Sequence, residues 1–190
     1  MKFPHPFRMK PEKEAAHRLY TALVVQARQP GFYVNCGVPD TLIGRFDMIS
    51  VHAFLILRRL KGDPGQTADL AQELFDIMFG DMDQNIREMG VGDLGVGKRV
   101  KAMAKAFYGR IAAYEAGLEG NDEVLAAALK RNLYCKVSPP DSALEAMLFY
   151  LRREAAALEA MELERLIAGE VRFGPPPAAG GETGSREETR

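Results

Sequence analysis

The chain has 190 residues, the length of one ordinary domain with or without tails. Hydrophobic residues make up 47% and charged residues 27%, as in globular proteins, and the net charge of -1 excludes a global electrostatic attraction to nucleic acid or anionic membranes. The most apolar run, residues 51–57, is far shorter than the roughly 20 residues that a membrane-spanning helix needs.

Apolar residues recur at helical spacing in almost every segment, and sustained alternation of period two is missing, which predicts an all-α protein. Pro11 suits the first position of a helix that is expected to end before Pro30-Gly31. The segment that follows, 32–39, is expected to be an aromatic loop. It would present Phe32 and Tyr33 outside any helical stripe that could bury them.

The next helix is expected from a cap at Asp40 or Thr41 to Leu60. It is apolar nearly all round, which is typical of a central, buried helix. A third helix, capped by Thr67, is expected to end near Gly80, and a short helix follows over 82–89. The glycine-rich segment 90–97 is then expected to form a flexible elbow between helices.

Beyond this elbow, apolar residues at spacings of three and four predict a long helix over 96–118. Asn121 is placed to cap the next helix, which ends near Tyr134, and Ser142 with Glu145 forms a capping-box pattern for a last long helix. From Gly174 onward the sequence has almost nothing to bury and predicts disorder.

The expected domain organisation has three parts. An N-terminal arm covers 1–10, and a single compact helical domain of about six to seven helices covers 11–173. A disordered tail covers 174–190.

The glycine elbow matches two nucleotide-binding patterns only in part. Gly90-x-Gly92-x-x-Gly95 fits a dinucleotide fingerprint, and the spacing from Gly92 to Gly97-Lys98 fits most of a phosphate-binding loop. Both motifs need a preceding strand, whereas the residues before the elbow predict helix. Arg99 also stands where the phosphate-binding loop needs Ser or Thr.

The remaining polar residues suggest no other chemistry. No histidine pairs with another histidine or a cysteine at metal-binding spacing, and the two cysteines, Cys36 and Cys135, indicate a reducing compartment. We therefore expect no catalytic residue, no cofactor and no metal. A nucleotide- or lipid-handling enzyme that uses the elbow at 90–97 is the alternative.

Charged residues around the elbow indicate a docking surface. Between residues 96 and 113 there are five basic residues and no acidic one, while acidic residues dominate just upstream. Such a pair of patches would attract a partner of complementary charge. The hypothetical partner-binding residues are Phe32, Tyr33, Asp40, Arg45, His52, Asp83, Arg87, Asp93, Lys98, Arg99, Lys101 and Lys105. A solvated face with local ion pairs is the alternative for the charges, and helix packing is the alternative for His52.

Three segments resemble the ubiquinol–cytochrome c chaperone family over about residues 20–115: PDTLIGRFDMISVHAFLILRRL, AQELFDIMFGDMDQNIREMGVGDLGVGKRVKAMAKAFYGR and IAAYEAGL. The second combines the glycine elbow, the acidic run and the basic helix in one order. The resemblance implies a non-enzymatic chaperone that binds newly made cytochrome b, or a related membrane-protein client, and assists assembly of ubiquinol–cytochrome c reductase, which is complex III of the respiratory chain.

The resemblance also implies partners and a location. Mitochondrial family members associate with the ribosome and act with a small partner subunit, whereas DNA is not expected as a partner. The basic N-terminal stretch lacks an apolar core of signal-peptide length. We therefore expect a bacterial member in the cytoplasm, at most peripheral at the inner face of the membrane. An RNA- or ribosome-associated helical module remains a further alternative.

Overall fold

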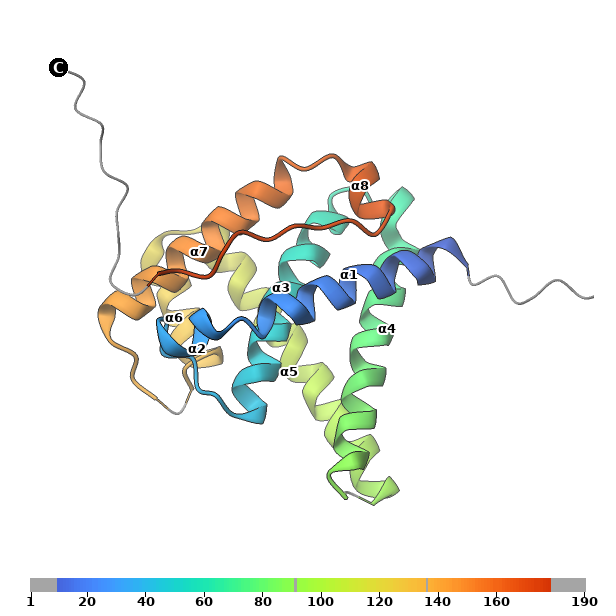
Figure 1. Ribbon diagram of the computed structural model, residues 1–190, viewed down its shortest axis with the longest axis horizontal. Helices are drawn as coiled ribbons and strands as arrows, with labels where there is room; N and C mark the ends of the chain where they lie inside the picture. Colours follow the sequence, from blue (N-terminus) through green and yellow to red (C-terminus); the bar gives the residue numbers. More distant parts are fainter. Residues whose placement is uncertain (1–9, 91, 136, 179–190) are drawn as a thin grey trace, which may run out of the picture.

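The computed structural model describes residues 10–90, 92–135 and 137–178, which contain eight helices and no strand (Figure 1). The predicted all-α class is therefore confirmed. Two of the helices, α2 and α8, have only five residues each. The helices are α1 Pro11–Ala27, α2 Pro30–Val34, α3 Leu42–Lys61, α4 Pro64–Glu88, α5 Asp93–Glu119, α6 Asp122–Asn132, α7 Asp141–Glu159 and α8 Leu163–Ile167.

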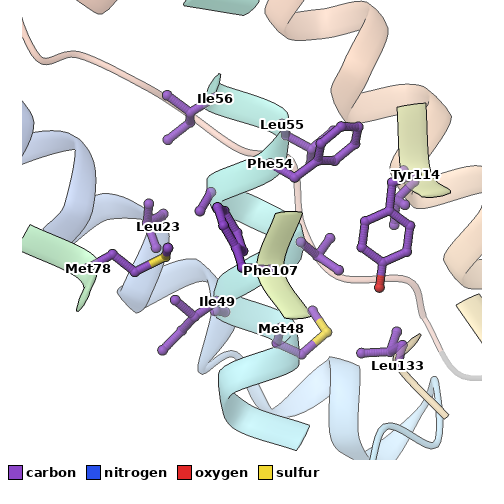
Figure 2. Close-up of a cluster of buried hydrophobic side chains, with 14 of the residues drawn as sticks. Leu23, Met48, Ile49, Phe54, Leu55, Ile56, Met78, Phe107, Tyr114 and Leu133 are labelled. Atoms are coloured by element: carbon purple, nitrogen blue, oxygen red, sulfur yellow. The ribbon is translucent and has the colours of Figure 1, made fainter. Parts of the chain in front are cut away.

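Helix α3 lies at the centre, in contact with α1, α4, α5 and α7. Every residue from 46 to 56 is buried, as the all-round apolar sequence predicted. Thr41 caps its N-terminus, because the Gly44 N–H donates to Thr41 Oγ1 at 3.1 Å. Figure 2 shows the Phe54 side chain of this helix beside Tyr114 of α5. The centroids of these two rings are 5.6 Å apart.

Helices α4 and α5 form an antiparallel hairpin whose tip projects from the body (Figure 1). The prediction that a helix ends near Gly80 and a separate short helix follows is wrong, because α4 continues through this glycine. A single helical glycine costs only about 1 kcal/mol relative to alanine. The buried side chains on both sides of it, Met78, Phe79 and Met82, hold the helix in place.

The cap predictions had mixed outcomes. Asn121 caps α6, since its Oδ1 accepts the Val124 N–H at 3.1 Å. Thr67 is no cap, because α4 begins earlier, at Pro64; its buried hydroxyl bonds to carbonyls of the preceding turn. The Ser142 capping box is also absent, since the N-cap position of α7 is Pro140, and no side chain caps that helix.

An extended segment after α8, residues 169–178, lies across α1 and α7, and we call it the C-terminal strap (Figure 1). A disordered tail was expected from Gly174, but residues 174–178 are held against the helices by hydrogen bonds. The expected boundary was misplaced because composition does not reveal that side chains elsewhere bind the strap's main chain. Residues 1–9 and 179–190 lie outside the described residues, so the arm and the rest of the tail stay predictions.

Candidate partner-binding site

The predicted basic stripe lies on the projecting arm. Lys98, Arg99, Lys101 and Lys105 are all exposed on α5, while Phe107 of the same helix is fully buried. The helical period therefore separates the cations from the core, as the sequence indicated. Within the described ranges none of these four side chains forms an ion pair, so their charge faces solvent.

The acidic residues beside this stripe are engaged with one cation at the tip of the arm. Arg87 pairs with Asp83 of its own helix at 2.5 Å and with Asp93 at the start of α5. Arg87 and Asp93 are exposed and Asp83 is partly exposed, and ion pairs of this kind contribute little to stability. The alternative of a solvated face with local ion pairs therefore describes Arg87, Asp83 and Asp93. The lysines of α5 have no such ion pair among the described residues and remain candidates for partner binding.

A second group of proposed residues surrounds a shallow hollow of about 250 Å³ between the end of α1, α2 and the start of α3. Asp40 and Arg45 line it and pair with each other at 2.7 Å. Tyr33 lines it too, and its hydroxyl donates to the Ala27 carbonyl at 2.7 Å. The adjacent Val34 is 80% exposed, so the hollow has an apolar rim as well as charged walls.

Phe32 does not belong to this surface. The expected aromatic loop is the short helix α2, which Pro30 begins, and its helical turn directs Phe32 inward. The ring is fully buried, with its centroid 4.9 Å from that of Tyr150 and 5.5 Å from that of His52, both edge-on. The expectation that Phe32 is exposed is therefore wrong.

His52 is also fully buried, so the helix-packing alternative describes it and surface docking does not. Its Nδ1 donates to the Met48 carbonyl at 2.8 Å, and its Nε2 accepts from the Tyr150 hydroxyl at 2.7 Å. The same hydroxyl accepts from Gln26 at 3.0 Å, which completes the chain of bonds around a neutral ring. Burial lowers the pKa of His52 to about 4, against a weaker opposing effect of the Met48 carbonyl.

A buried ion pair joins α3 to α5, and sequence reasoning missed it. Asp47 is 1% exposed, and its Oδ1 accepts from Arg110 at 2.6 Å. Burial raises the pKa of Asp47 to about 6, although the Arg110 guanidinium opposes this shift. An acidic residue inside an otherwise apolar helix was the only signal in the sequence.

The rest of the described chain offers little for other chemistry. Among those residues no group of three or more His, Cys, Asp or Glu side chains could hold a metal, and no helix has the length and apolar character to span a bilayer. The expected flexible elbow over 90–97 is wrong in part, because residues 93–97 are the first residues of helix α5. The segment follows helix α4, so the strand that nucleotide-binding motifs require does not precede it. The expected lack of cofactors and metals stays a prediction.

The neutral state of His52 predicts a pH dependence. Its pKa is lower in the folded chain than the usual 6.5, so its contribution to stability is complete above about pH 6.5 and is lost as the pH falls toward 4. His52→Gln removes this loss. Between about pH 7 and about pH 4.5 we expect wild type to lose about 2–3 kcal/mol more unfolding free energy than the variant. The raised pKa of Asp47 makes the unfolding free energy change with pH in the opposite direction, but by the same amount in wild type and in the variant.

Urea unfolding of both proteins at the two pH values measures this difference. Equal losses of stability in both would show that His52 titrates normally and is not held neutral by the fold.

The family model described as ubiquinol-cytochrome C chaperone matches residues 34–173. The ubiquinol-cytochrome-c reductase complex assembly factor 1 of Xenopus laevis is 30% identical over 164 residues, which cover 86% of this chain and 82% of that protein. The Mus musculus protein of that name is 31% identical, but the matched part spans only 56% of its length.

A solved structure is also similar. The crystal structure of the Cbp3 homologue from Brucella abortus has a TM-score of 0.77 and 40% sequence identity. The match covers 86% of this chain and 91% of that one, so it extends over nearly all of the helical body.

Proposed function

Because the chain belongs to the ubiquinol–cytochrome c chaperone family, we propose that it is a non-enzymatic assembly chaperone for ubiquinol–cytochrome c reductase, complex III of the respiratory chain. The observation that carries this proposal is the family match over residues 34–173, which include every helix from α3 to α8. The relatives named as assembly factors of that complex support it.

The proposed client is a newly synthesised membrane protein, with cytochrome b as the candidate. The chain would meet it in the cytoplasm, at most peripherally at the inner face of the membrane. A ribosome and a small partner subunit are further proposed partners. An assembly chaperone needs a surface that recognises such a partner, and the unpaired cations of α5 supply one.

The docking surface that we propose has two parts. The first is the lysine face of α5, with Lys98, Lys101 and Lys105 on the projecting arm. The second is the hollow beside Tyr33 and Arg45. Exposed cations on an arm that extends from the body steer an acidic partner and set its association rate more than its affinity.

A charge-reversal variant tests this proposal. Lys98, Lys101 and Lys105 all changed to Glu should leave the melting temperature within a few degrees, because the three side chains are exposed and unpaired. In a strain that lacks the native protein, we expect the variant to restore complex III to a level several-fold below that restored by wild type. Co-purification of the client should weaken most at low salt.

The matched control reverses three exposed lysines elsewhere, Lys13, Lys61 and Lys130, and so changes the net charge equally. It should support complex III as wild type does. Wild-type levels of complex III with both variants would place the docking surface elsewhere. An equal defect in both would show that only net charge matters.

A further inference from the structure

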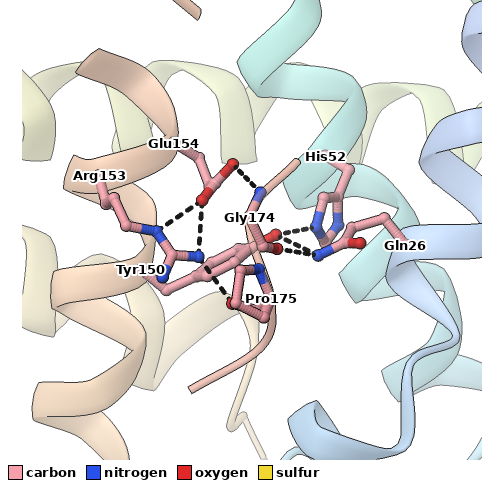
Figure 3. A network of polar contacts seen from close by, with 7 residues as sticks. All are labelled: Gln26, His52, Tyr150, Arg153, Glu154, Gly174 and Pro175. Carbon is pink, nitrogen blue, oxygen red and sulfur yellow. Dashed lines mark hydrogen bonds and ion pairs between the residues drawn. The ribbon is translucent and has the colours of Figure 1, made fainter. Parts of the chain in front are cut away.

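Within the C-terminal strap, Gly174, Pro175 and Pro177 are hydrogen-bonded through their main chain, and Figure 3 shows the contacts of the first two. Gln26 of α1 donates to the Gly174 carbonyl at 2.7 Å, and Arg153 of α7 donates to the Pro175 carbonyl at 2.7 Å. Glu154 accepts the Gly174 N–H at 2.9 Å. Asn35, just after α2, donates to the Pro177 carbonyl at 3.0 Å. We call the seat of the strap between α1, α2 and α7 the groove. It presents hydrogen-bond donors to the strap's carbonyls and one acceptor to the Gly174 N–H.

This arrangement fits the composition of residues 174–177, Gly-Pro-Pro-Pro. Three consecutive prolines carry no N–H, so a segment of this kind has carbonyls to satisfy and only the glycine N–H to donate. Its conformational freedom is already restricted, which lowers the entropic cost of binding it in an extended form. Grooves that bind proline-rich peptides use the same two properties.

The groove also selects side chains. The Phe173 ring lies edge-on to His52, with 4.9 Å between the ring centroids, and is half-buried. A Cβ at Gly174 would lie 2.7–2.8 Å from polar atoms of Arg153 and Glu154, so this position favours glycine. The sequence that the groove accepts is therefore aromatic, then glycine, then prolines.

The floor of the groove is built by side chains of α3 and α7. Tyr150 bonds to His52, and Arg153 pairs with buried Glu154 at 2.7 Å. If the strap left, the Glu154 Oε2 atom and one Gln26 donor would lose their partners, and leaving buried polar groups unpaired is costly. The groove is thus complementary to an extended chain, either the strap or a segment of equivalent chemistry.

The strap has a defined point of attachment. Arg18 holds the Ala168 carbonyl with two bonds, at 3.2 Å from Nε and 2.7 Å from Nη2. The next residue, Gly169, has a φ of +80°, which favours glycine. This anchor of α8 does not involve the residues that occupy the groove.

We propose that the groove between α1, α2 and α7 is a docking site for an extended aromatic–glycine–proline segment of a partner protein. Residues 173–177 of the chain occupy it as an intramolecular competitor. The partner segment displaces them by making the same main-chain hydrogen bonds.

The test uses the purified full chain and a fluorescent synthetic peptide, RFGPPPA, with the sequence of residues 172–178. Phe173→Ala and Gly174→Ala weaken the competitor without changing the groove. Because an occupied site lowers the apparent affinity in proportion to the free fraction, each variant should bind the peptide about tenfold more tightly than wild type, as measured by fluorescence anisotropy. The matched peptide RFAPPPA should bind to none of the proteins.

Adding Glu154→Met to the Gly174→Ala variant should abolish peptide binding, since it removes the carboxylate that accepts the glycine amide and leaves no acceptor in its place. Unchanged affinity in both folded strap variants would overturn the proposal. Unfolding of both would also overturn it, because the strap would then be an inseparable part of the core. The anisotropy measurement is independent of complex III levels, so its failure leaves the proposed chaperone function untouched.

Discussion

Phe32→Ala is expected to lower the free energy of unfolding by about 3–5 kcal/mol, the usual range for a large ring removed from a core. The Phe32 side chain is fully buried and contacts the rings of Tyr150 and His52. A five-residue helix such as α2 has no stability of its own, so this ring fixes its position. The cavity left by alanine would also loosen the floor of the strap groove.

Val34→Ala is the matched control, because it truncates an apolar side chain in the same helix that is 80% exposed. It should change the unfolding free energy by no more than about 0.5 kcal/mol. Both values come from urea unfolding followed by circular dichroism. A stability loss below about 1 kcal/mol for Phe32→Ala would restore the interpretation of an exposed aromatic loop.

Arg110→Met is expected to cost about 3–5 kcal/mol, because it leaves the Asp47 carboxylate buried without its cation. Asp47 is 1% exposed, and its second oxygen, Oδ2, has no hydrogen-bond partner among the described residues. One guanidinium contact, at 2.6 Å, therefore offsets part of the desolvation of this carboxylate. The loss should shrink as the pH falls toward 5, because the unpaired carboxyl, whose pKa rises further above about 6 without Arg110, is protonated there.

The double variant Asp47→Leu with Arg110→Met separates pairing from packing. Apolar replacement of a whole buried ion pair is often neutral or stabilising, so it should recover most of the lost stability. Thermal and urea unfolding of the wild type, both single variants and the double variant form a complete cycle. If the double variant instead loses the sum of the two single losses, the pair is not coupled.

The parts of the fold that were predictable from the sequence depend on local signals. A side-chain oxygen placed directly before an apolar helix caps it, and this holds at Thr41 and Asn121. The all-round apolar character of α3 marks a central helix, and the spacing within α5 separates Lys101 from Phe107. None of these inferences requires knowledge of which helices meet.

The parts that were not predictable depend on contacts between distant residues. Pro30 is compatible with the end of one helix and with the start of another. Only the packing of Phe32 against α3 and α7 favours the start of a new helix, α2, at this residue. Asp47 and Arg110 are 63 residues apart, so no spacing rule pairs them. Residues 174–178 have little to bury, but side chains of earlier helices bind their backbone, which composition alone cannot reveal.

The place of the strap has a consequence for the order in which the chain folds during synthesis. Its contacts with α1 and with Asn35 join residues 142–148 positions apart, so they cannot form until almost all of the described residues have been translated. Translation proceeds at roughly 5–20 residues per second, so the strap becomes available on the order of 10 s or longer after α1 has been translated. Meanwhile α3 and α4 can already pack against its other side. The N-terminal helices of the nascent chain thus pack together first, and the C-terminal strap covers α1 last.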